Sequence, residues 1–203
     1  MNFFQQKTVK RKKKKFKSNS IHSKMHKMVT FKFSQGFLLD LIQLPENETL
    51  EDWLAVNIVE FYNKILVLHE NLSEICTPRS CPKMTAAPKY ISTLLDWAST
   101  EINDPELFPS DPEVDFPKNF KKRVKVIFRR LFRFFAHVYH HHFEAIREAG
   151  VDHHLNNCYK HFLYFVMNYK LLNTNELLPL QELNKRIIQK DKEEEENKIQ
   201  KKK

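Results

Sequence analysis

Glycine is nearly absent from this chain, which has only Gly36 and Gly150 among its 203 residues. The phosphate-binding loops of nucleotide-dependent enzymes need several glycines at fixed offsets, because the backbone must approach the phosphates closely. Two isolated glycines cannot supply such a loop. The sequence also has no G-x-S-x-G nucleophile elbow. Its composition therefore argues against nucleotide chemistry and against elbow-type hydrolysis.

Cysteine is scarce as well, and long apolar segments are missing. Three cysteines argue against a disulfide framework. No apolar run approaches the roughly 20 residues that a membrane-spanning helix needs. A lysine block follows Phe3 and Phe4, where a secretory signal would continue with apolar residues. We therefore expect an intracellular protein without a transmembrane segment, located in the cytoplasm, with the nucleus as a further compartment.

Acidic residues are missing from the first 27 positions, which hold ten lysines and arginines. This segment accounts for the formal net charge of +9, because the remaining residues contain 24 basic and 25 acidic side chains. A basic segment of this kind can contact RNA, acidic lipid headgroups or an import receptor. The alternative is a solvated, disordered arm without a specific partner.

Strand patterns and internal repeats are also missing, whereas apolar residues recur at three- and four-residue spacing, which predicts an all-α fold. The longest predicted helix covers residues 119–149, with Asn119 near its N-cap and Gly150 as its C-terminal stop. Further helices are predicted at 49–72, 90–101, 152–168 and 171–188, the last broken near Pro179. We expect a helical domain at residues 31–188 between a basic disordered tail (1–30) and a charged tail (189–203).

The predicted helix that begins near Thr49 has two kinds of surface. Its apolar positions recur at helical spacing and are expected to face a core: Trp53, Val56, Val59, Ile65 and Leu68. Its acidic positions leave an acidic outer surface: Glu46, Glu48, Glu51, Asp52 and Glu60. Composition alone leaves open whether this outer surface is merely solvated or docks a partner.

Cysteine and histidine form two groups with the composition of a zinc site. Cys76 and Cys81 lie in a loop, and histidines 137 and 140–142 lie in the long helix. Structural zinc takes such pairs from two separate elements. On an ideal helix, at about 100° per residue, His137 and His141 lie about 40° apart but His137 and His142 about 140° apart. His142 can therefore join His137 only at a bulge or break. The alternative is free buried cysteines with exposed histidines; Cys158 is expected to be a lone buried thiol.

The first half of the long helix is basic, and three arginines stand close together: Arg129, Arg130 and Arg133. Several guanidinium groups in one place bind phosphate strongly, so a phosphoserine or phosphothreonine peptide is the ligand that this cluster suits. Nucleic acid is the rival ligand, but the near-neutral charge of the body and the intervening phenylalanines favour a small pocket. The third possibility is ion pairing with the acidic segment 101–115.

Several segments resemble the Mob (phocein) family of kinase co-activators in order and spacing, and the wording of some is most similar to the Mob3-like branch. The resemblance extends from about residue 43 to 188 and is carried by LEDWLAVNIVEFYNKI, EICT, SCPKM, APKYISTLLDW, RRLFRFFAHVYHHHF, HLNNCYKHFLYFV and ELLPLQEL. One departure is clear. Few residues separate Cys81 from Ala87, where the family has a β-hairpin flap. Either the flap is lost or the coding sequence omits an exon.

The resemblance implies a helical domain around a four-helix bundle with one structural Zn²⁺. The zinc ligands that it implies are Cys76, Cys81, His137 and His142. It implies a phosphopeptide pocket at Arg129, Arg130 and Arg133. It also implies a docking surface for the regulatory segment of NDR/LATS-type kinases at Glu48, Asp52, Trp53, Glu60 and His161.

Three functions follow from these observations. The leading hypothesis is a non-catalytic adaptor of Hippo-pathway kinases that binds NDR/LATS-type kinases, upstream STE20-type kinases and phosphorylated peptides, with no small-molecule substrate. The second is a zinc-dependent hydrolase, although the site has neither an evident open position nor an H-E-x-x-H general base. The third is a nucleic-acid binder that uses its basic tail, which the charge distribution disfavours.

Overall fold

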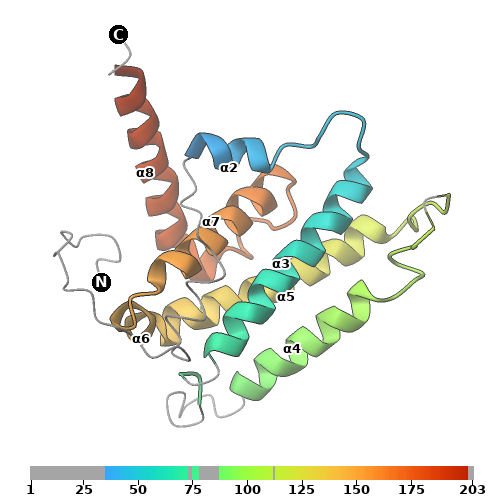
Figure 1. Ribbon diagram of the computed structural model, residues 1–203, viewed down its shortest axis with the longest axis horizontal. Coiled ribbons are helices and arrows are strands. Elements are labelled where there is room, and N and C mark those ends of the chain that lie inside the picture. The colour runs from blue at the N-terminus through green and yellow to red at the C-terminus, as the bar shows by residue number, and fades with distance from the viewer. Residues whose placement is uncertain (1–34, 73–74, 78–86, 112, 201–203) are drawn as a thin grey trace.

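The computed structural model describes residues 35–72, 75–77, 87–111 and 113–200 (Figure 1). Every regular element in these ranges is a helix, which confirms the predicted all-α class. The elements are α2 (Gln35–Leu41), α3 (Leu50–Leu72), α4 (Ala87–Ile102), α5 (Phe120–His141), α6 (Phe143–Glu148), α7 (Asp152–Asn168), the 3₁₀-helix η2 (Leu178–Leu180) and α8 (Gln181–Gln200). None of the helices in this part of the chain combines the length and the hydrophobicity that crossing a bilayer requires.

Four helices, α3, α4, α5 and α7, form the core of the fold. Helix α5 packs against both α3 and α4, and α7 packs against α3. A cluster of fully buried phenylalanines joins α3, α5 and α7: Phe61, Phe128, Phe135, Phe162 and Phe165. Their ring centroids lie between 5.1 and 5.9 Å apart, mostly in edge-on and tilted arrangements that aromatic pairs favour. This aromatic cluster fixes α5 as the central helix on which the candidate sites are built.

Helix α3 begins as predicted, but two of its predicted core positions are exposed. The Thr49 hydroxyl accepts a hydrogen bond from the Asp52 backbone N–H at 3.1 Å, as an N-cap does. The predicted core positions Val56 and Val59 are 61% and 37% exposed, so that prediction was wrong for both. The predicted core positions Ile65 and Leu68 are buried, in a stripe that also contains Leu54, Ile58, Phe61 and Leu72. At about 100° per residue these six fall within about 80° of one another, opposite Val56 and Val59.

The predicted helix over residues 119–149 is two helices. Asn119 is at the N-cap of α5 but makes no capping hydrogen bond with its side chain. The helix then stops at His142, whose φ of −128° departs from helical geometry, and α6 follows at once. Gly150 has a φ of 72°, and the N–H groups of Gly150 and Val151 bond back to the carbonyls of Arg147 and Ile146. These two bonds form a Schellman motif, which confirms Gly150 as the stop.

The C-terminal part differs most from expectation. Helix α7 matches the predicted helix over 152–168, and α4 contains the predicted helix over 90–101. Residues 171–177, however, are not helical, and the last helix begins only after η2, where Pro179 occupies a first-turn position that proline tolerates. Helix α8 continues to Gln200, beyond the residue 188 at which the domain was expected to end.

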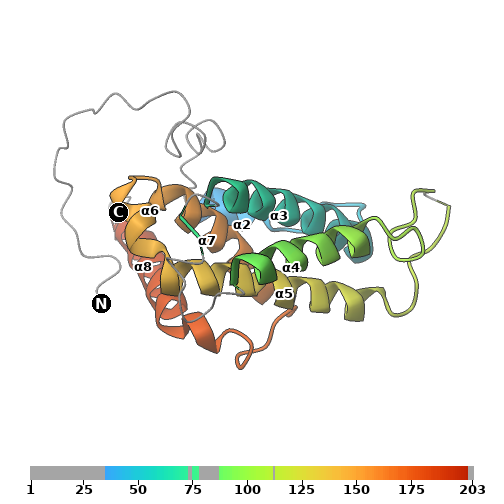
Figure 2. The ribbon, with the colours of Figure 1, turned by 90° about the horizontal axis from the view of Figure 1, so that it is seen from below.

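The peripheral helices are attached to the core by specific polar contacts. The Tyr169 hydroxyl donates a hydrogen bond of 2.6 Å to the carbonyl of Ile42, directly after α2. On α8, the buried carboxylate of Asp191 accepts from the Lys160 ammonium at 2.6 Å and from the Tyr164 hydroxyl at 2.5 Å. Beyond Asp191, α8 extends away from the bundle (Figure 1). Viewed from below, α5 lies between α4 and the segment that leads into α8 (Figure 2).

The Asp191 contacts generate a stability prediction. Replacing Asp191 by Ala leaves the mostly buried ammonium of Lys160 without its counter-charge, so the free energy of unfolding should fall by about 3 kcal/mol. Glu182→Ala, which removes the exposed pair of Glu182 with Lys185 on the same helix, should leave stability unchanged. Urea unfolding followed by circular dichroism measures both. Equal stability of the two variants would show that Asp191 does not hold α8 to α7.

Candidate metal centre and binding surfaces

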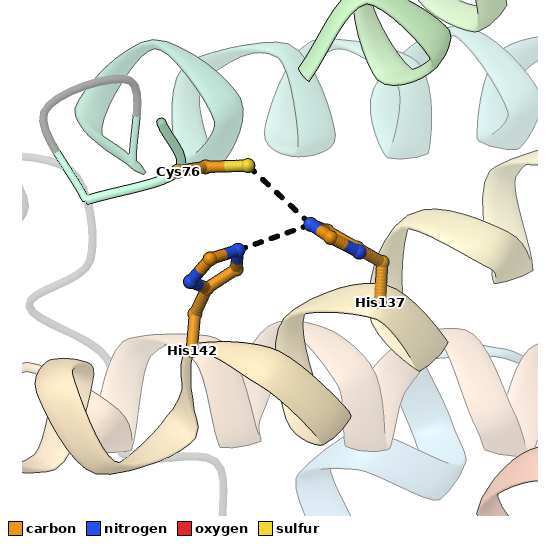
Figure 3. A group of neighbouring side chains, drawn as sticks. All are labelled: Cys76, His137 and His142. Atoms are coloured by element: carbon orange, nitrogen blue, oxygen red, sulfur yellow. Dashed lines mark hydrogen bonds between the residues drawn. The ribbon is translucent and has the colours of Figure 1, made fainter. Parts of the chain in front are cut away.

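Three predicted metal ligands meet at one point (Figure 3). Cys76 follows the end of α3, His137 lies in the last turns of α5, and His142 is the residue between α5 and α6. The Cys76 Sγ lies 3.4 Å from the His137 Nε2, and the His142 Nε2 lies 3.0 Å from the same atom. One donor atom from each residue lies within 4.8 Å of the other two. The structure thus brings together side chains that are 61 and 5 residues apart in the chain.

The departure from helical geometry at His142 makes this meeting possible. A continuous helix would point His142 well away from His137 and would favour His141 instead. The φ of −128° at His142 turns its ring toward His137, and the side chain is only 2% exposed. His141, in contrast, is exposed. The break that the sequence required for a site with His142 is therefore present.

The two donor separations that involve His137 fit a tetrahedral metal ion. Zinc bonds of about 2.0 Å to nitrogen and about 2.3 Å to sulfur place two nitrogens about 3.3 Å apart and a sulfur and a nitrogen about 3.5 Å apart. The observed 3.0 and 3.4 Å are close to these values. Burial, followed by the neighbouring histidines 142, 141 and 69, lowers the pKa of His137 to about 4. Burial and His141 lower the pKa of His142 as well. Both rings are therefore neutral at physiological pH, the form that binds metal.

The rest of the expected metal chemistry is less complete. The predicted fourth ligand, Cys81, lies outside the described residues. Glu144, the acidic residue nearest in sequence, is exposed and pairs with Arg147, so it does not face the three ligands. Cys158 is a buried thiol, as predicted, and burial raises its pKa to about 12. In the described part of the chain, the site therefore has the ligands of a structural centre but no carboxylate that could act as a general base.

The geometry predicts which histidine holds the metal. Purified His142→Asn should lose the bound ion, whereas His141→Asn should retain about one ion per chain, because only His142 points into the site. Metal content measured by mass spectrometry after gel filtration, with the protein concentration determined in parallel, distinguishes the two. Loss of metal in both variants, or in neither, would contradict the assignment.

The three predicted phosphate-binding arginines do not share one environment. The Arg130 guanidinium carbon lies 3.8 Å above the centre of the Trp97 ring, and the Arg133 Nη1 donates a 2.7 Å hydrogen bond to the Tyr90 hydroxyl. Both partners belong to α4. Arg129 instead forms an ion pair with Glu176, in the segment before η2. The cluster is therefore divided: Arg130 and Arg133 contact α4, and Arg129 contacts the segment before η2.

The acidic segment that follows α4 pairs with a different arginine. Arg123 contacts Glu101 at 2.7 Å and Asp104 at 3.3 Å. Ion pairing with the acidic segment was one of the alternatives for the arginine cluster. The residue that forms these ion pairs is Arg123, which precedes the cluster on α5. Arg130 and Arg133 are held by aromatic side chains, which leave their positive charges without a counter-charge from that segment.

The outward face of α3 combines apolar and acidic side chains. Asp52, Val56 and Val59 point away from the core, and all three are exposed. Glu48 is also exposed, just before the helix begins, and Glu60 is partly exposed beside its ion-pair partner Lys64. Val56 and Val59 were not among the predicted docking residues. Their angular position, opposite the buried stripe, was the signal in the sequence that could have identified them.

Two other predicted docking residues lie deeper. Trp53 is half-buried and packs against the core. His161 is fully buried, and its Nδ1 lies 3.2 Å from the Lys64 ammonium. Burial, followed by Lys64, lowers the pKa of His161 to about 3, so the ring is neutral and can accept this hydrogen bond. His161 therefore contacts Lys64, which in turn holds Glu60 on the α3 surface.

Comparison with known proteins places these features in a family. A model of the Mob1/phocein family matches residues 31–89 and 85–180. MOB kinase activator-like 3 of Drosophila melanogaster is 40% identical over 215 residues, which cover 95% of this chain and 97% of that protein. MOB kinase activator-like 1A of Arabidopsis thaliana is 41% identical over 199 residues (88% and 93%), and human MOB kinase activator 3A is 39% identical over 199 residues (87% and 92%).

The matches also bear on the missing flap. The two segments matched by the family model meet at residues 85–89, and the alignment with the Drosophila protein spans more positions than the 203 residues of this chain. Both findings fit a segment that the relatives have and this chain lacks, next to residues that the structure does not describe. The relatives are named as activators of kinases, and the chain is a non-catalytic protein. The chain belongs to the Mob1/phocein family.

Proposed function

We propose that the chain is an adaptor and co-activator of NDR/LATS-type protein kinases. It binds a basic regulatory segment of the kinase on the outward face of α3, and a phosphorylated peptide from an upstream kinase of the STE20 type at Arg130 and Arg133. The names of the relatives, which describe kinase activators, support a role in kinase regulation. The observation that carries the proposal is the presence of two exposed surfaces of opposite charge on one helical core.

The α3 surface suits an amphipathic basic segment. Val56 and Val59 form a small apolar strip, and the carboxylates of Asp52 and Glu60 flank it. A partner helix with apolar residues on one face and lysine or arginine beside them can bury the valines and pair with the acids. Lys64 and the buried His161 set the position of Glu60, so His161 acts as a positioning residue beneath this surface.

The arginine site suits a phosphate group. Trp97 lies against the guanidinium plane of Arg130, and the Tyr90 hydroxyl holds Arg133. Such contacts order the arginines before a ligand arrives, which reduces the entropy lost on binding. Ordered guanidinium groups bind phosphate through paired, charge-assisted hydrogen bonds. Arg129 can contribute only if the ligand competes with Glu176 for it.

We infer that the metal is Zn²⁺, with Cys81 completing the set formed by Cys76, His137 and His142. The two histidines and the cysteine are the ligand types that structural zinc prefers. A bound ion would tie the segment after α3 to the junction of α5 and α6, and so stabilise the bundle that carries both surfaces. Its role is structural, and no chemical step is assigned to it.

Activation requires no catalytic group in this chain. An adaptor can shift a kinase toward its active state only by binding that state more tightly than the inactive one. Simultaneous binding of an upstream phosphopeptide would also bring the two kinases together and raise their effective concentration. The helical domain would carry both surfaces, and α8, which Asp191 holds to α7, would extend it past residue 188.

A cross-binding experiment tests the proposal. The two probes are a fluorescent amphipathic peptide with lysine, arginine and leucine at helical spacing, and a fluorescent phosphothreonine peptide. Val56→Lys should lower the affinity for the basic peptide roughly tenfold, because it adds repulsion on the α3 face only. The affinity for the phosphopeptide should not change. Arg133→Ala should lower the affinity for the phosphopeptide roughly tenfold and leave the affinity for the basic peptide unchanged. Fluorescence anisotropy measures both affinities.

The matched controls are exposed substitutions away from each site. Ser92→Lys, on the outer face of α4, should not affect the basic peptide, and Lys122→Ala, on α5, should not affect the phosphopeptide. The unphosphorylated peptide should bind no variant. The two-surface proposal fails if Val56→Lys and Arg133→Ala each lower the affinity for both probes equally. It also fails if Lys122→Ala lowers the affinity for the phosphopeptide as much as Arg133→Ala does.

A further inference from the structure

A groove with a basic rim lies between α5 and α8, on the side of α5 away from α4. It has a volume of about 670 Å³, and most residues of the segment that connects α7 to η2 contribute to its lining. Its apolar lining consists of Met167, Leu171, Leu172, Leu177 and Ile188. Its cationic lining consists of Lys125, Arg129, Lys170 and Lys185. A volume of this size is typical of ligand-binding clefts.

The charge of the groove is strongly one-sided. Glu176 is the one acidic residue in its lining. The carboxylate of Glu176 is already engaged, because it accepts hydrogen bonds from Arg129 and, at 2.7 Å, from the backbone N–H of Asn173. Lys185 pairs only with the exposed Glu182. Within the described residues, neither Lys125 nor Lys170 forms an ion pair, so the groove attracts an anionic ligand.

The backbone at Lys170 supports a role for this residue beyond chain reversal. The N–H groups of Lys170 and Leu171 bond back to the carbonyls of Met167 and Val166 at 3.2 and 2.9 Å, which closes α7 with a Schellman motif. Lys170 occupies the left-handed position of this motif, with a φ of 50°. Glycine is the usual residue there, and Gly150 fills the same position after α6. Compared with glycine, a lysine at this left-handed position lowers the stability of the fold, but it adds a positive charge to the groove.

We infer that this groove is a docking site for an acidic linear peptide that carries a bulky apolar side chain. The apolar lining would bury that side chain, and Lys125, Lys170 and Lys185 would pair with acidic residues on either side of it. The site is separate from the one at Arg130 and Arg133, because their partners Trp97 and Tyr90 lie on α4 and do not line the groove. Arg129 belongs to the groove rather than to the other two arginines.

The test uses the full chain and a fluorescein-labelled peptide with a Phe-Leu pair between two Asp-Glu-Asp blocks. Lys125→Glu and Lys185→Glu should each weaken binding about tenfold, and a peptide with Ser-Ser in place of Phe-Leu should bind about tenfold more weakly. Lys122→Glu, on the same helix but outside the groove, should have no effect. Arg133→Ala should also have no effect, although it removes the proposed phosphopeptide site.

Lys170→Gly provides a variant whose effect cannot be attributed to unfolding. Glycine relieves the left-handed conformation, so the melting temperature should rise by about 2–4 °C while the acidic peptide binds more weakly. Three results would overturn the inference: equal losses for Lys122→Glu and Lys125→Glu, no effect of Ser-Ser, or displacement of the peptide by phosphatidylserine vesicles but not by unlabelled peptide. Loss of binding in Arg133→Ala would show that the groove is not a separate site.

Discussion

In the longest helical stretch of this protein, one residue leaves helical geometry, and the arrangement of the metal ligands depends on it. At His142 the backbone turns, and the ring moves to the side of the helix that carries His137. The His137 Nε2 then contacts both the His142 ring and Cys76, from the segment after α3. These contacts join the segment after α3 to the C-terminal end of α5. Arg123, which binds the acidic segment, lies near the N-terminal end of α5. An intact helix would point His142 away from His137 and would favour His141 beside it instead.

Different parts of the α5 surface contact different neighbouring elements. Its apolar face builds the aromatic core with α3 and α7. Toward α4, Trp97 and Tyr90 order two arginines, and toward α8, Glu176 orders a third. The sequence shows one continuous basic run, but the tertiary structure divides its three clustered arginines between two sides of α5. The outward face of α3 adds a third surface, of opposite charge. One helical core therefore carries surfaces of opposite charge on different helices.

Much of this fold could be predicted from the sequence, because helical periodicity, capping residues and Gly150 are local signals. The family was also recognisable, from motifs that span most of the chain. Three features could not be predicted in this way. The turn at His142 has no glycine or proline to mark it, and the reversal at Lys170 uses a lysine where glycine is usual. The separation of Arg129 from its neighbours depends on Glu176, a residue 47 positions away. The exposure of Val56 and Val59 could have been predicted, because the two valines lie opposite the stripe through Leu54 and Phe61.

X-ray absorption spectroscopy at the zinc edge of the purified full-length protein tests the central claim most directly. The proposed site predicts a four-coordinate ion with two sulfur ligands at about 2.3 Å and two nitrogen ligands at about 2.0 Å. The multiple-scattering pattern of imidazole should account for both nitrogens. A first shell of nitrogen and oxygen only, or a six-coordinate ion, would contradict the joining of Cys76 and Cys81 to His137 and His142.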